Sequence, residues 1–145
     1  MSILSITSQS AMKAVIFLAS KYEEGTRYSV QEIADYIGAS QHTVGKLLQT
    51  LVKEKVINSS KGPTGGFFIT KEQMKLPLIN VIYAIDGEMV FRTCGLGLRQ
   101  CSSTHPCPIH FEYKKSRDAM EKLFSTKKIA DLRKNVQEGL AHLNV

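Results

Sequence analysis

The chain has 145 residues, of which 43% are hydrophobic, and carries a formal net charge of +6 with its histidines neutral. This length suits one domain with a real core, and the hydrophobic content argues against wholesale disorder. No apolar run reaches the roughly 20 residues that a membrane-spanning helix needs, and no basic segment precedes the apolar run near the N-terminus as in a secretory signal. We therefore expect a cytoplasmic protein with no membrane contact, and its basic excess favours a polyanionic partner.

Three runs in the first part of the chain have the apolar spacing of amphipathic helices. The first covers 8–23. A capping box that begins at Ser29 starts the second, and Gly38 permits the tight turn after it. Ser40 is a good N-cap for the third run. Two short helices joined by a glycine-containing turn predict a helix-turn-helix at 29–53.

The outer face of the third run is polar and basic near its N-terminus. This end of a recognition helix meets base edges when the helix enters a major groove of duplex DNA. A solvated polar face explains the same residues equally well, so the downstream segment of the chain has to decide between the two interpretations. The candidates for DNA contact here are Ser40, Gln41, His42, Thr43 and Lys46.

A hairpin is predicted at 56–70, where two short strand-like runs flank a glycine-rich turn. A hairpin directly after a helix-turn-helix is the wing of a winged-helix domain. Its small tip residues can approach the DNA backbone or minor groove closely. The wing therefore favours the DNA-binding interpretation, and it adds Lys61, Pro63 and Thr64 to the contact candidates.

An apolar run at 76–86 predicts a further helix that ends at Gly87. After a cysteine-rich stretch, apolar residues at helical spacing predict a long charged helix through 113–124. Ser125 and Thr126 can cap a last helix. No internal repeat interrupts this order of elements.

These elements predict a mainly α protein with a small β-hairpin, a winged helix-turn-helix domain plus a long dimerisation helix. We place the DNA-binding domain at 1–86, a cysteine-rich sensor loop at 87–110, and the dimerisation helix with a C-terminal helix at 111–145. A helix with a narrow apolar stripe outside a compact head often pairs with its copy in a symmetric homodimer. Packing within its own subunit is the alternative.

All three cysteines of the chain lie in one short loop. Six residues separate Cys94 from Cys101, five separate Cys101 from Cys107, and His110 follows closely. Three sulfurs and an imidazole on one loop containing glycine and proline can converge on a single point. Such thiolate-rich sets suit zinc or an iron–sulfur cluster, and an odd cysteine count is natural for a metal or redox site in a reducing compartment.

Other classes of function explain these residues less well. A zinc-dependent nucleic-acid-binding module would use the same ligand types, but the loop offers no aromatic residues among its non-ligand positions on which RNA bases could stack. A cysteine–histidine pair could serve an enzyme as nucleophile and base. Because nothing indicates a substrate pocket or an oxyanion site, we expect no enzymatic activity.

The helix-turn-helix, the wing and the cysteine loop together resemble a bacterial family of winged-helix regulators, which includes the iron–sulfur cluster regulator IscR and the nitric-oxide-responsive repressor NsrR. The resemblance runs from about Thr7 to Leu132. Its most specific pieces are SSKGPTGGFFIT at 59–70, AIDG at 84–87 and the three cysteines, and the GAS-x-x-x-V-x-x-LL pattern from Gly38 adds to them.

The resemblance implies a homodimeric transcriptional regulator, which we take to be a repressor, that binds palindromic double-stranded operator DNA. It also implies an iron–sulfur cluster on Cys94, Cys101 and Cys107, with His110 as fourth ligand in the IscR-like pattern. His105, which lies inside the loop, competes for that role. We favour [2Fe-2S] over [4Fe-4S], with zinc, no metal or a thiol switch as alternatives. The chain departs from the IscR pattern at Gly45, where an acidic residue is usual, and its first cysteine spacing is one residue longer.

Overall fold

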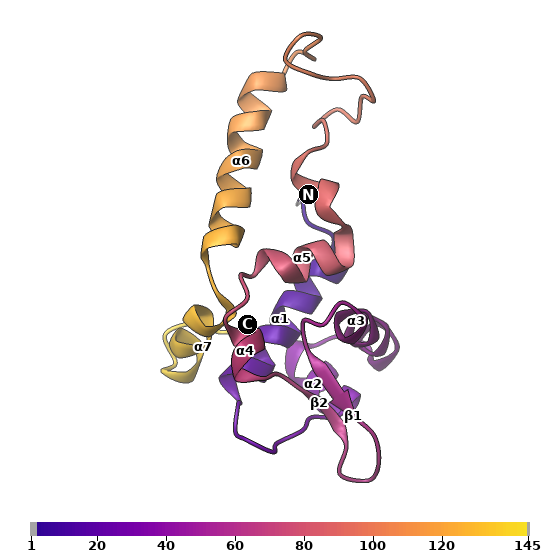
Figure 1. The fold of residues 1–145 in the computed structure, drawn as a ribbon, viewed down its shortest axis with the longest axis vertical. Coiled ribbons are helices and arrows are strands. Elements are labelled where there is room, and N and C mark those ends of the chain that lie inside the picture. The colour runs from indigo at the N-terminus through magenta and orange to yellow at the C-terminus, as the bar shows by residue number, and fades with distance from the viewer. Residues whose placement is uncertain (1–2, 145) are drawn as a thin grey trace.

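The computed structural model describes residues 3–144, and these residues form seven α-helices, one short 3-10 helix and a two-stranded antiparallel sheet (Figure 1). This arrangement confirms the predicted fold class. No helix of the described residues is long and apolar enough to span a membrane. The elements are α1 (Ile6–Ser20), α2 (Val30–Ile37), α3 (Gln41–Lys53), β1 (Asn58–Ser60), β2 (Gly66–Phe68), α4 (Lys71–Met74), α5 (Ile79–Asp86), η1 (Glu88–Phe91), α6 (His110–Thr126) and α7 (Ile129–Gln137).

Helix α1 is the centre of a compact unit that we call the head, formed by α1 to α5, α7 and the sheet. It packs against α2, α3, α5 and α7. Three of its small and branched residues, Ala11, Ala14 and Val15, are fully buried, so neighbouring helices approach closely. The helix begins earlier than its apolar spacing predicted, because the Ser5 hydroxyl accepts a hydrogen bond from the Ser8 amide at 3.0 Å and caps it.

The helix-turn-helix forms as its local signals predict. At the start of α2, the Ser29 hydroxyl accepts from the Glu32 amide and the Glu32 carboxylate accepts from the Ser29 amide, both at 3.1 Å, which makes a capping box. Gly38 ends α2 with a φ of 72°, which few other residues tolerate. The Ser40 hydroxyl then caps α3 by accepting from the Thr43 amide at 3.2 Å.

The wing is a hairpin in which Asn58 to Ser60 pair with Gly66 to Phe68. It is fixed to the connection between α1 and α2, because Tyr28 and Phe67 exchange backbone hydrogen bonds of 2.9 and 2.8 Å. A Cβ atom at Gly66 would lie 2.7 Å from the Tyr28 carbonyl oxygen, and the φ there is 143°. Glycine is therefore required where the wing meets the head.

Helix α5 begins at Ile79, later than the apolar run predicted. The three preceding residues pair instead with the connection between α6 and α7: the Leu78 amide donates to the Lys127 carbonyl at 2.8 Å, and the Ile129 amide donates to the Leu76 carbonyl at 3.0 Å. Pro77 at the centre of this bridge provides no amide donor. The short helix η1 after Gly87 carried no recognisable sequence signal.

The prediction that Ser125 and Thr126 cap the last helix is wrong. Both residues lie in the final turn of α6, where their hydroxyls donate to the Lys122 carbonyl at 3.2 and 2.8 Å. Helix α7 starts at Ile129, after two intervening residues, and the Lys128 amide donates to the Asp131 carboxylate at 3.1 Å.

The two C-terminal helices differ in their packing. Helix α7 lies against α1 within the same subunit: Ile129 is fully buried, and the Gln137 side chain donates to the Ser20 carbonyl at 2.9 Å. Helix α6 stands away from the head beside the cysteine loop (Figure 1). We call residues 92–126, the loop and α6 together, the arm. Its base packs on the head through a small cluster that includes Ile82, Phe91 and Phe124.

Candidate metal centre and nucleic-acid interface

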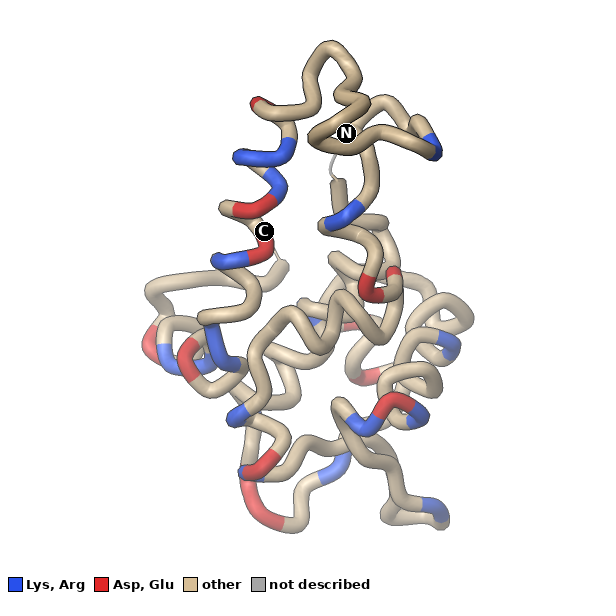
Figure 2. The backbone as a smooth tube through the Cα atoms, turned by 45° about the horizontal axis from the view of Figure 1, so that its top comes forward, with Lys and Arg blue, Asp and Glu red and all other residues tan. Residues whose placement is uncertain are grey.

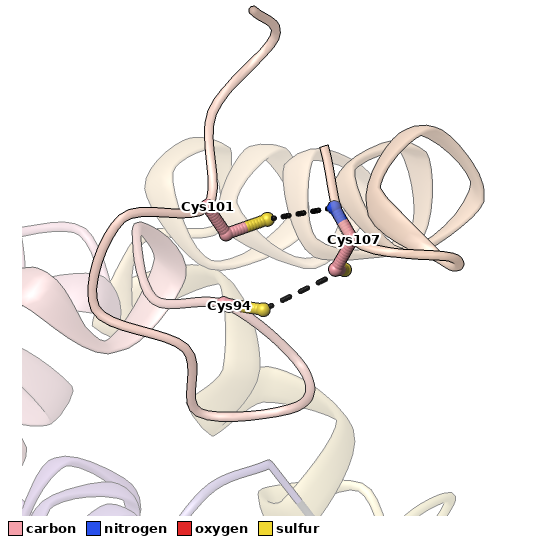
Figure 3. A group of neighbouring side chains, drawn as sticks. All are labelled: Cys94, Cys101 and Cys107. Carbon is pink, nitrogen blue, oxygen red and sulfur yellow. Dashed lines mark hydrogen bonds between the residues drawn. The ribbon is translucent and has the colours of Figure 1, made fainter. Parts of the chain in front are cut away.

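The loop between η1 and α6 brings the three cysteine side chains to one place (Figure 3). Their sulfur atoms all lie within 4.8 Å of one another, and the Cys94 and Cys107 sulfurs are 3.6 Å apart. Backbone amides point at the same sulfurs: Leu96 donates to Cys94 at 3.3 Å, and Cys107 donates to Cys101 at 3.4 Å. Donors of this kind stabilise thiolates, which are the forms that bind metals.

The thiols differ in their ease of ionisation. Hydrogen bonds from the Leu98 and Leu96 amides lower the pKa of Cys94 from 9.0 to about 7. Burial raises the pKa of Cys107, whose side chain is the least accessible of the three. Cys94 therefore ionises more readily than Cys107 in the metal-free chain. These amide donors left no trace in the sequence pattern, because every residue other than proline supplies one.

His110 is the first residue of α6 and touches the edge of the cysteine set. Its Nδ1 atom lies 3.1 Å from the Cys101 sulfur. His105 lies inside the loop, and its ring contacts the Thr104 hydroxyl at 3.4 Å. The imidazole of His110 thus reaches one cysteine sulfur, but it is not among the ligand atoms that lie within 4.8 Å of one another, which come from the three cysteines alone.

The spacing of the sulfurs bears on which metal group fits. Thiolates around one tetrahedral zinc ion at about 2.3 Å would lie about 3.8 Å apart. The observed separations, from 3.6 Å to at most 4.8 Å, match a single ion. A cluster distributes its ligands over two or more irons, so at least one pair of sulfurs would have to move farther apart. The donor set suits either group, since both take thiolate and imidazole ligands.

Helix α3 and the wing present a second candidate surface. The segments 40–53 and 58–68 contain three lysines and no acidic residue, and Glu54 follows directly between Lys53 and Lys55. Figure 2 shows blue marks along this part of the trace, with one red mark at the end of α3. His42 and Lys46 are exposed and border hollows of about 290 and 790 Å³ on either side of them. A shaped, positively charged face of this kind suits a polyanion.

The other predicted contact residues are exposed, with one qualification for Ser40. Gln41 and Thr43 are exposed on the first turn of α3, while the Ser40 hydroxyl is engaged in capping that turn. The wing-tip residues Lys61, Pro63 and Thr64 are all exposed.

A residue that the sequence did not single out supports the wing. The guanidinium carbon of Arg27 lies 3.5 Å from the centre of the Phe68 ring, and its Nε donates to the Ser60 hydroxyl at 3.3 Å. Arg27 therefore contacts both strands and braces the hairpin against the head. Nothing local distinguishes it from an ordinary surface arginine, since its partners lie more than 30 residues away.

Comparisons with known proteins agree with this arrangement. The model of the Rrf2 family, described as iron-dependent transcriptional regulator, matches residues 4–135. The chain is 24% identical over 136 residues to the HTH-type transcriptional regulator NsrR of Oceanobacillus iheyensis, which covers 93% of this chain and 92% of that protein. It is 26% identical over 125 residues to the HTH-type transcriptional regulator IscR of Photorhabdus laumondii, with coverages of 86% and 75%.

A solved structure shows the same fold. The structure of CymR, the global cysteine regulator of B. subtilis, superposes with a TM-score of 0.74 and covers 92% of this chain and 98% of that chain. The sequence identity between the two is 20%, so this likeness establishes the shared fold alone.

Proposed function

Because the chain belongs to the Rrf2 family of transcriptional regulators, we propose that it is a homodimeric regulator of operator DNA whose affinity follows the state of the Cys94, Cys101 and Cys107 site. One observation carries the proposal: three sulfurs lie within 4.8 Å of one another on a loop joined directly to the DNA-reading head. The named relatives are transcriptional regulators, which supports a role other than catalysis.

In the proposed complex, α3 of each subunit enters a major groove. Gln41, His42 and Thr43 would face base edges from its first turn, and Lys46 would reach a phosphate. Lys61 at the wing tip would contact the backbone nearby, with Pro63 and Thr64 beside it. Each such phosphate contact releases counterions, so binding would weaken as salt increases.

The homodimer is supported by apolar side chains that the arm and η1 leave exposed. Met89 is 62% exposed, Phe111 57% and Leu123 49%. These side chains lie along one projecting structure, where a partner subunit would remove them from water. A second copy of the same arm would cover them and would set two recognition helices at a fixed spacing.

A short series of contacts joins the cysteine loop to α3, the proposed recognition helix. Helix α5 packs against both α1 and α3. Asp86, at its end, accepts hydrogen bonds from the Ser5 amide at 3.2 Å and the Ser5 hydroxyl at 2.6 Å, and Ser5 caps α1. Only η1 separates this junction from the loop. A 100-fold switch in DNA affinity would need about 2.7 kcal/mol of differential stabilisation between two arrangements of these elements.

The cofactor that we favour is an iron–sulfur cluster held by the three cysteines and His110, with [2Fe-2S] preferred to [4Fe-4S]. Such a cluster would supply a group whose charge and integrity change with redox state. A second candidate is a single zinc ion, which the sulfur spacing favours. In that case the metal would fix the loop and the regulator would answer to another signal.

Metal analysis of anaerobically purified protein tests the proposal. We expect iron and acid-labile sulfide together with visible absorption from thiolate-to-iron charge transfer. Detection of zinc without iron would refute the cluster and support the second candidate, a single zinc ion. A triple Cys→Ser variant should then lose the metal and change its affinity for operator DNA. An unchanged affinity in that variant would contradict control by this site while leaving DNA binding intact.

A further inference from the structure

One face of α6 contacts the segment 91–101, which runs from η1 into the cysteine loop, at successive points. The helix descends from the loop toward the head while the segment ascends beside it, so the contacts follow an antiparallel order (Figure 1). From the head upward they are Phe124 with Phe91 (ring centres 6.1 Å), Glu121 with Arg92 (3.4 Å), Arg117 with the Thr93 carbonyl (2.6 Å), Tyr113 with Gly95, and His110 with the Cys101 sulfur (3.1 Å).

Arg117 is the unusual member of this series, because it is a cation buried outside any ion pair that the structure shows. Its side chain belongs to a residue only 9% exposed, and its Nη1 donates to the Thr93 carbonyl at 2.6 Å. Its Nε has no hydrogen-bond partner among the described residues, and its guanidinium carbon lies 6.0 Å from the Tyr113 ring centre. Burying a guanidinium is unfavourable unless its bonds are strong. The hydrogen bond to the Thr93 carbonyl is therefore the contact that stabilises the buried guanidinium of Arg117.

Gly95 lies on the other side of Cys94 and is equally constrained. A Cβ atom added there would lie 2.7 Å from the ring of Tyr113. Its φ is outside the left-handed region, so the backbone itself would accept alanine. The glycine is needed because the Tyr113 ring presses against the chain at this point. Cys94 is thus held between two neighbours that one face of α6 fixes.

We propose that Arg117 and Tyr113 form a clamp that positions Cys94 for metal binding. They are positioning residues, since neither offers a ligand atom to the cysteine set. The inference rests on the proposed function to the extent that it takes the three cysteines as ligands. Residues that orient metal ligands typically alter metal affinity by about 10–100-fold when they are replaced. The clamp also makes the affinity of the site depend on the placement of α6.

Titration of the metal-free protein with Co²⁺ under anaerobic conditions tests the clamp without iron or DNA. Thiolate-bound Co²⁺ absorbs visible light, and competition with a chelator gives its affinity. Arg117→Met keeps the length of the side chain and removes the donors, and we expect at least about tenfold weaker binding. Arg117→Lys should recover part of the loss, because it restores a charged donor. Lys115→Met, on an exposed position of the same helix, should change the affinity by less than about twofold.

A double-mutant cycle guards against a variant that merely misfolds. Gly95→Ala should weaken Co²⁺ binding by about tenfold in the parent chain, and by no more than about threefold when Tyr113→Ala has removed the ring. Equal losses in both backgrounds, or unchanged binding in a folded Arg117→Met variant, would overturn the clamp and leave the metal site standing. A parent protein that binds no Co²⁺ through thiolates would overturn the site and the clamp together.

Discussion

The head and the arm are held together in different ways. In the head, apolar side chains from α1, α2, α3 and α5 are buried, and the starts of α1, α2 and α3 are capped by their own local residues. The arm projects from this unit and leaves Phe111 and Leu123 about half exposed. Within it, α6 is joined to the start of the cysteine loop by a short series of mostly polar contacts. The head therefore has a buried core of its own, whereas the proposed metal and second subunit would complete the contacts of the arm.

The largest expected difference between the head and the arm comes from removing one large apolar side chain from each. Leu48 in α3 is fully buried, and Leu48→Ala should lower the free energy of unfolding by about 2–5 kcal/mol because it leaves a cavity. Leu96→Ala in the loop removes the same atoms from a side chain that is about half exposed, and its cost should be about 0.5 kcal/mol. Urea denaturation followed by circular dichroism measures both. Similar losses would mean that the loop belongs to the same cooperative core.

The same division explains which parts of the fold could be predicted from the sequence. The helix-turn-helix and wing followed from signals within a few residues: the Ser29 capping box, the turn at Gly38 and the glycine-rich hairpin tip. The start of α5 could not be predicted, because 76–78 pair with residues about 50 positions later. Ser125 and Thr126 were misassigned because a hydroxyl caps the next helix or bonds back to its own, and local sequence does not decide which.

The site was predictable to a similar extent. The meeting of the three sulfurs followed from their placement on one short loop. The contact of Arg117 with Thr93 spans 24 residues, and an arginine in a charged helix is ordinarily expected to face water. The close approach of Gly95 to Tyr113 is likewise a tertiary contact with no local signal. Ligand types are thus visible in the sequence, whereas the residues that position them are not.

Metal removal sharpens the comparison through local dynamics. With metal bound, the amides of Leu96 and Cys107, which point at sulfurs, should be protected from hydrogen exchange. Chelation should accelerate their exchange by about 100-fold, equivalent to about 2.7 kcal/mol of local stability. Amides of α3 should exchange at unchanged rates, because the head does not need the metal. Mass spectrometry of peptic fragments measures exchange in both regions. Equal acceleration in α3 and in the loop would contradict a head that is stable without the metal.

Lysines on the two regions should differ in their effect on DNA binding. Lys46→Ala removes a charge from the reading face, and we expect about tenfold weaker operator binding, since a charge-assisted contact contributes about 1.5–3 kcal/mol. The slope of log affinity against log salt should fall by about 0.9 for the lost phosphate contact. Lys115→Ala on α6 makes the same change of net charge away from that face. If both variants shifted the slope equally, the effect would come from overall charge and the proposed docking would be wrong.

The smallest expected effect is a change in the alkylation rate of Cys94, which tests whether the cysteine loop is formed before metal binds. The lowered pKa of Cys94, about 7, depends on the Leu98 and Leu96 amides pointing at its sulfur. In metal-free folded protein at pH 7, iodoacetamide should therefore alkylate Cys94 about fivefold faster than in the urea-unfolded chain, since a larger thiolate fraction outweighs its lower nucleophilicity. Cys107, whose pKa burial raises, should react more slowly than in the unfolded chain.

The lowered pKa of Cys94 also determines how folding stability depends on pH. The folded chain holds the Cys94 proton less tightly than the unfolded chain, where the pKa is near 9.0. The stabilising contribution is therefore complete above about pH 9 and is lost as the pH falls through about 7. Alkylation profiles of Cys94 that coincide in the folded and unfolded protein would show that the amides reach the sulfur only after metal has ordered the loop. The arm would then depend on its metal for its fold, in full contrast to the head.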